Sequence, residues 1–354
     1  MSVAERIYDH EIQQKLSVYP MIRYMGSKHR LSTWIYDILK GIEFESALDA
    51  FSGSGVVSYL FKAMGKRVYT NDFLHFSSLI ARGLIENQNQ SLSEEDKKML
   101  INRDVDSKYF ISNTFKGIFY TEDELLFLDK VSANISKLDS QYKRALAYTA
   151  LFRACIKKQP RGVFTVSGNL ERYDDGRRDL RLTLTDHFVE QANIYNELIF
   201  DNGQNNLTFN QNIFDFNNEL YKPDLVYLDP PYVPRSDDNC YVKRYHFLEG
   251  LSKYWEGETI MQDTKVKKIK KKFTPFSYRK TSLMAFETLF DKFSASTLAL
   301  SYSSNAYPDL HTLVSIMKKY KSVVRVHEKP HRYHFGNHQN VNRSMVSEYL
   351  IIGT

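Results

Sequence analysis

The sequence predicts an α/β protein in which helices cover both faces of a mostly parallel sheet, and a mainly helical segment interrupts that sheet. Strand-like and helix-like segments alternate near both ends of the 354-residue chain, whereas the middle is richer in helical patterns. A chain of this length has room for about two domains. We expect residues 1–84 and 206–354 to build one α/β domain, which carries a basic loop near residues 237–280 and into which residues 85–205 are inserted.

Seven segments rich in β-branched or aromatic residues are the predicted strands. They are residues 45–51, 66–72, 207–216, 223–231, 297–304, 322–329 and 347–353. A Ser-Gly-Ser-Gly turn follows the first strand and leads into an apolar-periodic helix, for which Gly65 is the expected stop. The last five strands come only after the helical middle, which is why we expect an insertion.

The middle of the chain carries its own helix signals. Thr121 and Glu124 fit a capping box at the start of a helix that continues to about residue 138. A second helix is predicted over residues 140–158, before a proline. Residues 171–182 contain an Asp-Gly pair, which predicts a hairpin or a long turn.

The composition is typical of a soluble globular protein, with 42% hydrophobic and 25% charged residues. The N-terminus lacks the apolar stretch of a signal peptide, and no apolar run is long enough to cross a bilayer. Two cysteines, Cys155 and Cys240, are too few for a disulfide framework or a tetrahedral metal site. We therefore expect a cytoplasmic protein with reduced thiols, no membrane partner and no metal.

Basic residues are clustered although the net charge is only +6. Residues 265–273 contain six lysines, and residues 153–162 form a second basic loop. Such clusters are typical of proteins that bind nucleic acid. A solvated surface face is the alternative explanation for either cluster taken alone.

A glycine motif, "DAFSGSG", follows the first predicted strand. Gly53 and Gly55 allow a tight turn and a close approach of the backbone to a ligand, and the next helix points its N–H groups there. Asp72 ends the second strand nineteen residues after Gly53, where a carboxylate can accept hydrogen bonds from a ribose. The motif lacks the third glycine of a dinucleotide site. It therefore suits S-adenosylmethionine, with an ordinary βα turn as the alternative.

Two further motifs lie on either side of this one in the sequence. "DLVYLDPPYVPR", residues 224–235, ends a strand with Asp229 and two prolines, which stop the strand and stiffen the chain. "MIRYMGSKHRL", residues 21–31, places a glycine turn and Lys28 before an amphipathic helix. In an open α/β sheet, ligands bind at such strand ends.

In their order and spacing, "RYMGSK", "DAFSGSG" with Asp72, and "DPPY" resemble the Dam-like class of N6-adenine-specific DNA methyltransferases. The resemblance implies a Rossmann-like S-adenosylmethionine-dependent methyltransferase fold, with a mostly parallel seven-stranded sheet and an inserted target-recognition domain. It also implies that a methyl group passes to the exocyclic N6 of a flipped adenine in double-stranded DNA, leaving S-adenosylhomocysteine. A cognate restriction endonuclease is a possible partner.

The resemblance also assigns residues. Catalytic residues are Asp229, Pro230, Pro231 and Tyr232, and cofactor contacts are Tyr24, Lys28, Asp49, Phe51, Gly53, Gly55, Asp72, Ile213, Phe214 and Asp229. Contacts with DNA are expected from Arg153, Lys157, Lys158 and Arg161 in the insert, and from Lys267 and Lys268 in the lysine run. Cytosine-N4 enzymes more often have Ser in place of Asp229, so adenine is the favoured base.

Two other functions stay open. An RNA amino-methyltransferase also uses a DPPY-type loop, but it would be expected to lack the N-terminal motif and the large insert. A catalytically inactive DNA-binding subunit with the same fold would be expected to lack Asp229, Tyr232 or the glycines of the loop. The sequence contains all of these residues. His246 and Glu249, which follow DPPY, are expected to have structural roles.

Overall fold

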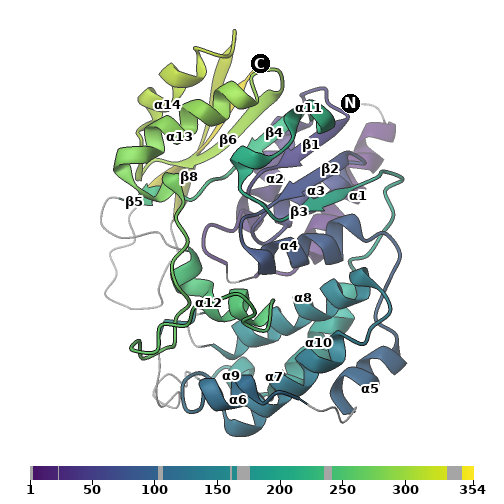
Figure 1. Ribbon diagram of the computed structural model, residues 1–354. Coiled ribbons are helices and arrows are strands. Elements are labelled where there is room, and N and C mark those ends of the chain that lie inside the picture. Colours follow the sequence, from purple (N-terminus) through teal and green to yellow (C-terminus); the bar gives the residue numbers. More distant parts are fainter. Residues whose placement is uncertain are drawn as a thin grey trace.

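A computed structural model gives the architecture of residues 3–22, 24–102, 107–159, 162–165, 176–234, 241–332 and 345–354 (Figure 1). Seven strands form one sheet in the order β3-β2-β1-β4-β6-β9-β8. Their bounds are β1 Ser46–Asp49, β2 Arg67–Asn71, β3 Leu207–Phe209, β4 Leu225–Leu228, β6 Thr297–Ser303, β8 Val324–Arg332 and β9 Met345–Gly353. Only β9 runs antiparallel to both of its neighbours, β6 and β8. The predicted mostly parallel seven-stranded sheet is confirmed.

The strand order reverses between β1 and β4. The chain passes outward from β1 to β2 and β3, then returns to place β4 on the other side of β1. Asp49 ends β1, and Asp229 directly follows β4. The carboxyl ends of two adjacent parallel strands meet at this reversal, which is where open α/β sheets bind their ligands. The glycine and DPPY motifs are therefore neighbours in space.

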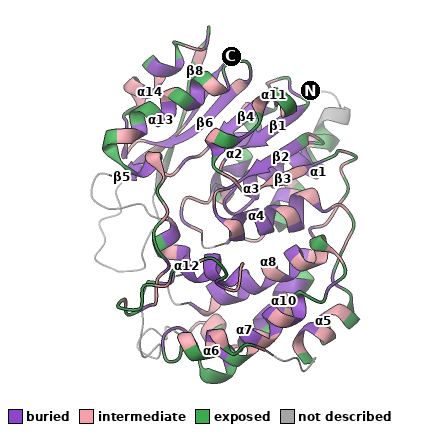
Figure 2. Cartoon of the chain, in the orientation of Figure 1, coloured by how far each residue is buried: buried purple, intermediate pink, exposed green. Residues whose placement is uncertain are grey.

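Helices cover both faces of the sheet because its strands alternate their buried side chains. Leu48 and Val226 belong to a core with α13 (Arg279–Lys292) and α14 (Leu310–Met317). Ala47 and Tyr227 point to the opposite core, which includes residues of α1, α2 and α3. Those helices span Val3–Val18, Ser32–Leu39 and Val56–Ala63. The central strands accordingly consist mainly of buried residues (Figure 2).

A layer of helices lies below the sheet (Figure 1). It contains α5 Glu94–Asn102, α6 Phe110–Thr114, α7 Glu122–Ile135, α8 Gln141–Lys158, α9 Arg178–Arg181 and α10 Leu184–Asn196. Helix α8 packs against both α10 and α4 (His75–Ala81), and its apolar side chains belong to the same core as α4. At the π-helical turn Arg82–Glu86, a Cβ on Gly83 would lie 3.1 Å from the Leu146 nitrogen. The helical layer and the α/β part thus share one core.

Local signals in the helical middle are confirmed where the structure describes them. The side chains of Thr121 and Glu124 form the reciprocal capping box at the start of α7. Gly65 has φ +69° just after α3, as expected of a helix stop. Residues 171–175 lie outside the described residues, and the later part of that predicted hairpin forms the short helix α9.

Two predicted strands are too long. The strand predicted over residues 207–216 ends at Phe209, and Ile213–Asp215 forms a 3-10 turn in which the Asn212 side chain accepts the Phe214 N–H. Asn210 also turns away from the ladder, donating its side-chain N–H to the Asp72 carbonyl at 2.8 Å. Strand β4 stops at Leu228 because Pro230 and Pro231 have no N–H to donate.

Helix α12 (Tyr241–Leu251) lies beside the carboxyl edge of the sheet (Figure 1). A tight turn follows it, in which Trp255 has φ +59° and donates its backbone N–H to the Gly250 carbonyl at 2.7 Å. The buried Trp255 ring therefore lies directly against Gly250.

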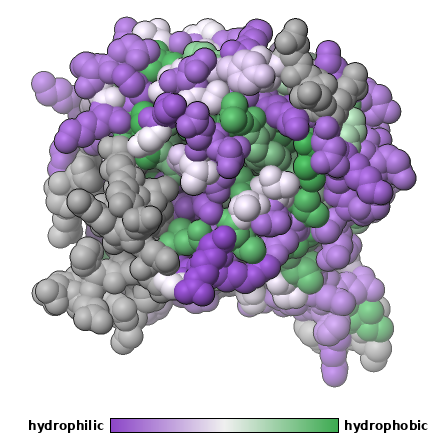
Figure 3. Space-filling model, turned by 90° about the horizontal axis from the view of Figure 1, so that it is seen from below, coloured by the Kyte–Doolittle hydropathy of each residue, from purple (hydrophilic) through white to green (hydrophobic). Residues whose placement is uncertain are grey.

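No helix among the described residues is long and apolar enough to cross a membrane. On the face seen from below, hydrophobic residues gather in the middle and hydrophilic residues surround them (Figure 3). Most of the apolar surface is instead buried in the two cores that flank the sheet.

We predict that Gly250→Ala destabilises the fold. A Cβ at this position would lie 2.2 Å from atoms of the Trp255 ring, so the ring or the helix must shift. We expect the free energy of unfolding in urea to fall by about 1–3 kcal/mol. Gly41→Ala is the control, because its nearest contact would be 3.7 Å from the Ile38 carbonyl. Equal stability of the two variants would contradict this packing.

Candidate active site

One cavity opens at the carboxyl ends of β1 and β4. Its empty volume, including the open mouth, is about 1050 Å³. Its wall comes from residues within seven separate segments, which lie between residues 24 and 28, 49 and 57, 71 and 74, 212 and 213, 227 and 231, 241 and 242, and 272 and 277. Nine of the predicted site residues lie in this wall, namely Tyr24, Lys28, Asp49, Phe51, Gly53, Asp72, Ile213, Asp229 and Pro231.

The glycine loop forms the floor of the cavity and is held by Asp72. The Gly53 N–H donates to Asp72 Oδ2 and the Leu74 N–H donates to Asp72 Oδ1, both at 2.8 Å. Gly53 has φ +49°, and a Cβ there would lie 3.0 Å from the Tyr24 ring. The loop therefore needs glycine both for its backbone conformation and for the space beside Tyr24.

Tyr24 belongs to an aromatic wall that sequence reasoning found only in part. Its ring stacks on Tyr245 of α12, with centroids 5.0 Å apart and an interplanar angle of 7°. Tyr241, also from α12, lies 5.7 Å from Tyr24 and lines the cavity. The Met25 N–H donates to the Tyr245 hydroxyl at 2.7 Å, which fixes the N-terminal segment against α12.

Lys28 lies between two carboxylates. Its ammonium is 2.9 Å from Asp229 Oδ1 and 3.3 Å from Glu348 Oε1. Burial alone would lower the pKa of Lys28, but the charges of Asp229 and Glu348 outweigh it and hold that pKa well above its usual value. The Ser301 hydroxyl donates to Glu348 Oε1 at 2.9 Å. Sequence reasoning missed Glu348, whose only signal is an acidic residue within an otherwise apolar strand.

Burial raises the pKa of three carboxyl groups in the cavity wall. The pKa of Asp229 rises to about 6, because desolvation and Glu348 outweigh the attraction of Lys28. The pKa values of Asp49 and Asp72 rise to about 7, again chiefly through burial. Such shifts are common at functional sites.

Two buried polar atoms beside the glycine loop have no hydrogen bond among the described residues. They are Asp49 Oδ1 and Ser52 Oγ. The other oxygen of Asp49 accepts from the Ser58 hydroxyl at 2.5 Å. Buried polar atoms normally have partners, so this end of the cavity is suited to a polar ligand.

Phenylalanines form the apolar end of the cavity. The buried Phe276 ring lies edge-on to Phe51, with centroids 5.4 Å apart, and stacks on Phe214 at 5.7 Å. Ile213 is buried in the adjoining wall. Phe276 belongs to residues 272–277, which cover the cavity and which we call the roof segment. Sequence reasoning did not assign the roof segment to the site.

Four of the predicted catalytic and cofactor-binding residues lie outside the cavity wall. Gly55 is behind the floor, at the N-cap of α3 with φ +78°. Phe214 contacts the site through Phe276. Pro230 lies between the two wall residues Asp229 and Pro231, and the half-buried Tyr232 ring is edge-on to Tyr302 at 5.6 Å. The roles assigned to all these residues stay predictions.

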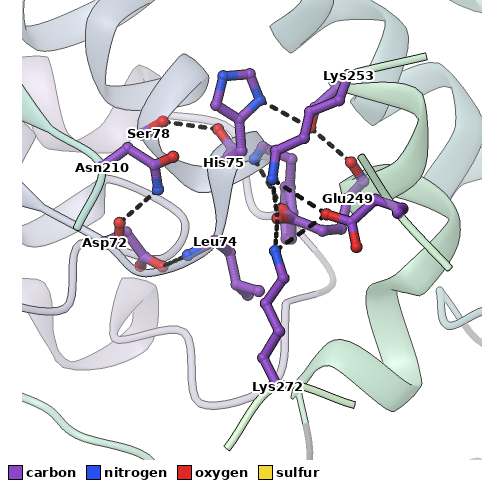
Figure 4. Close-up of polar contacts among 11 residues, drawn as sticks. Asp72, Leu74, His75, Ser78, Asn210, Glu249, Lys253 and Lys272 are labelled. Carbon is purple, nitrogen blue, oxygen red and sulfur yellow. Dashed lines mark hydrogen bonds and ion pairs between the residues drawn. The ribbon is translucent and has the colours of Figure 1, made fainter. Parts of the chain in front are cut away.

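A buried carboxylate anchors the roof segment (Figure 4). Glu249 of α12 pairs through Oε1 with Lys272 at 3.2 Å and with Lys253 at 3.3 Å. Its other oxygen accepts the Phe76 N–H at 3.2 Å. Figure 4 shows Lys272 reaching toward Glu249 from a different segment, near Asp72. Glu249 is thus bonded within the protein, consistent with the structural role expected for it.

His246 is also buried, and its Nε2 forms a hydrogen bond with the Phe164 carbonyl at 2.8 Å. Among the described residues, no group of three or more His, Cys, Asp and Glu side chains is arranged to hold a metal ion. Cys155 is free and buried, and Cys240 lies outside the described residues.

Several cations predicted to contact DNA have partners within the protein. Arg153 donates to the Met21 carbonyl at 2.7 Å, and Lys157 pairs with Asp179 at 2.8 Å. Lys158 pairs with Glu124 at 3.1 Å. In the lysine run, Lys267 donates to the Gln262 carbonyl at 2.6 Å and Lys268 is half-exposed, while Arg161 lies outside the described residues. Contact of these side chains with DNA stays a prediction.

A model of the D12 class N6 adenine-specific DNA methyltransferases matches residues 24–303, which span the cavity and the helical layer. The chain belongs to this family. It is therefore an adenine-specific DNA methyltransferase, and the family implies use of S-adenosylmethionine. The family match confirms the predicted enzyme class and the prediction that the enzyme methylates adenine in DNA.

Relatives of the enzyme are named as methylases. The type II methyltransferase M2.HphI of Haemophilus parahaemolyticus is 28% identical over 346 residues, covering 94% of this chain and 98% of that protein. The modification methylase StsI of Streptococcus sanguinis is 26% identical, and the type II methyltransferase M.FokI of Planomicrobium okeanokoites is 23% identical. These two alignments cover 92% and 93% of this chain but only 50% and 52% of the relatives.

We predict that Asp72→Ala weakens binding of S-adenosylmethionine roughly tenfold to a hundredfold, because the loop loses two charge-assisted hydrogen bonds. Isothermal titration calorimetry of the pure protein measures this directly. Asp291→Ala is the control, since Asp291 is exposed on α13 and lies outside the cavity wall. If Asp72→Ala bound S-adenosylmethionine with an unchanged dissociation constant, this would contradict the proposal that Asp72 holds the glycine loop for cofactor binding.

Proposed function

We propose that this enzyme transfers the methyl group of S-adenosylmethionine to N6 of an adenine flipped out of double-stranded DNA, as the modification enzyme of a restriction–modification system. The observation that carries the proposal is that Asp229 and the glycine loop face one cavity. The names of the relatives as type II methyltransferases and as a modification methylase support the biological setting.

The cavity wall fits the proposed cofactor. S-adenosylmethionine supplies an electrophilic methyl group on a positively charged sulfonium. The unpartnered Asp49 Oδ1 is suited to accept from an ammonium group, and Ser52 Oγ offers a second polar contact. Asp72, with Gly53 and Leu74 already bonded to it, keeps lone pairs for a ribose hydroxyl. Phe51 and Ile213 provide an apolar surface for a purine ring.

Asp229 and the Pro230 carbonyl are the proposed acceptors for the two N–H bonds of the adenine amino group. That nitrogen is a poor nucleophile because its lone pair is delocalised into the ring. Two acceptors held in place stabilise the positive charge that develops on the nitrogen and direct its lone pair toward the methyl group. Lys28, 2.9 Å from Asp229, favours the ionised carboxylate that this role requires.

The adenine must leave the duplex to reach Asp229, because its amino group is otherwise inside the base stack. Tyr232 follows the two prolines and is proposed to stack on the flipped base. The basic residues of the helical layer and the lysine run are proposed to hold the DNA backbone, which would make binding salt-dependent. Nothing in the cavity favours RNA over DNA, and the family match favours DNA.

The test is to incubate the protein with tritiated S-adenosylmethionine and unmethylated genomic DNA, with structured RNA alongside, and to identify the labelled nucleoside. N6-methyladenine in DNA is the expected product, and sequencing then maps the recognition site. Label in RNA or in cytosine would contradict the proposal that the substrate is adenine in DNA. No label in either nucleic acid would overturn the proposed activity of this chain alone.

We predict that Asp229→Ala lowers the rate of methylation at least about a hundredfold, because an acceptor for the amino group is lost. The dissociation constant for S-adenosylmethionine should change only a few-fold. Single-turnover methylation and calorimetry on the same preparation separate the two effects. Substantial activity in Asp229→Ala would refute the proposed mechanism.

The pKa of Asp229, raised to about 6 by burial, predicts the pH dependence of methylation. The ionised acceptor is present above this pKa and is lost as the pH falls through it. The single-turnover rate should therefore decrease as the pH is lowered below about 6. Asp49, with a pKa of about 7, also becomes protonated as the pH is lowered. Lys28→Met should move the midpoint upward and Glu348→Gln should move it downward, because Lys28 lowers that pKa and Glu348 raises it. Shifts in the same direction would contradict this electrostatic account.

A further inference from the structure

Two aromatic rings are exposed at the mouth of the cavity. Phe273 and Tyr278 stack with centroids 5.3 Å apart and an interplanar angle of 14°. The exposed fractions are 64% for Phe273 and 37% for Tyr278. Phe273 also lines the cavity that contains Asp229 and Pro231. A large apolar side chain thus faces solvent at the entrance to the methyl-transfer site.

The chain on both sides of Phe273 is fixed. Before it, Lys272 pairs with the buried Glu249 at 3.2 Å and with Glu258 at 3.1 Å. After it, the buried Phe276 packs between Phe51 and Phe214. Phe273 is therefore held at the surface by neighbours that are anchored in the interior.

The surroundings of the ring pair carry positive charge. The Lys271 ammonium lies 5.1 Å from the centre of the Tyr278 ring, and the Arg279 guanidinium lies 4.7 Å from the Tyr307 ring. Tyr307 belongs to β7 (Ala306–Tyr307), which pairs with β5 (Val233–Pro234) immediately after DPPY. Lys270 and Lys280 are exposed on the same stretch of chain. Aromatic rings beside cations are typical of surfaces that bind nucleotides out of the base stack.

We propose that Phe273 and Tyr278 form a platform on which the target adenine stacks at the cavity mouth after it leaves the duplex. The inference rests on the proposed transfer to a flipped adenine. Stacking on Phe273 replaces part of the stacking that the base loses in the duplex, and it does so before the base reaches Asp229. The platform is separate from Tyr232, which lies outside the cavity wall and packs on Tyr302.

The test uses Phe273→Ala and a duplex that contains the mapped recognition site. Single-turnover methylation, at saturating S-adenosylmethionine and with enzyme in excess, should slow by about 10- to 100-fold, as expected for one lost base–aromatic stack. Replacing the target by 2-aminopurine should show a smaller fluorescence increase on binding, because less of the base is extruded. Placing an abasic site opposite the target adenine should restore most of the rate, since extrusion is then easier.

Two further variants distinguish the loss of base stacking from a non-specific loss of activity. Phe273→Tyr keeps a ring and should retain the wild-type rate. Met284→Ala removes a side chain that is 66% exposed on α13, outside the cavity wall, and should also behave as wild type. Calorimetry with S-adenosylmethionine should give the wild-type dissociation constant for Phe273→Ala if only the platform is affected.

Three outcomes would contradict the proposed stacking platform without contradicting the proposed function. The first is a wild-type rate in Phe273→Ala, and the second is an equal loss on the paired and the abasic duplex. The third is a change of oligomeric state in Phe273→Ala, seen by light scattering, which would assign the exposed ring to a contact between two copies of the chain. Failure of the wild-type enzyme to methylate adenine in any DNA would overturn the proposed function and the platform together.

Discussion

The active site depends on one buried ammonium group, that of Lys28. It joins three distant parts of the chain, because Lys28 precedes α2, Asp229 follows β4 and Glu348 lies on β9. A buried charge is expensive without a partner, and removing one member leaves the others uncompensated. The three groups are satisfied only when the N-terminal segment docks on a sheet that already includes β9. The geometry around Asp229 and completion of the sheet are therefore linked.

The wall of the cavity depends on a second set of long-range contacts. Helix α12 contributes Tyr245, which stacks on Tyr24, and Glu249, which holds Lys272. One helix thus fixes the N-terminal segment on one side and the roof segment on the other. Both Tyr24 and Lys272, which this helix contacts, line the cavity, although they are 248 residues apart in the sequence.

Local rules predicted the features that neighbouring residues determine. The Thr121–Glu124 capping box, the stop at Gly65 and the seven strands all have short-range causes. Sequence reasoning missed contacts whose partners are far apart in the chain. Met25 and Tyr245 are separated by 220 residues, and nothing near either one indicates the other. The strand predicted through residue 216 was too long because the side chains of Asn210 and Asn212 bond to backbone groups outside the ladder.

The close contact at Gly83 bears on how tightly the helical layer is joined to the rest of the protein. The backbone of α8 lies close to that of the π-helical turn, since a Cβ on Gly83 would be 3.1 Å from the Leu146 nitrogen, and both elements belong to one continuous core. The helical layer is therefore not an exchangeable cassette. Grafting it from a distant relative would bring mismatched interior surfaces together. Substitutions of exposed side chains in the helical layer would leave that interior unchanged.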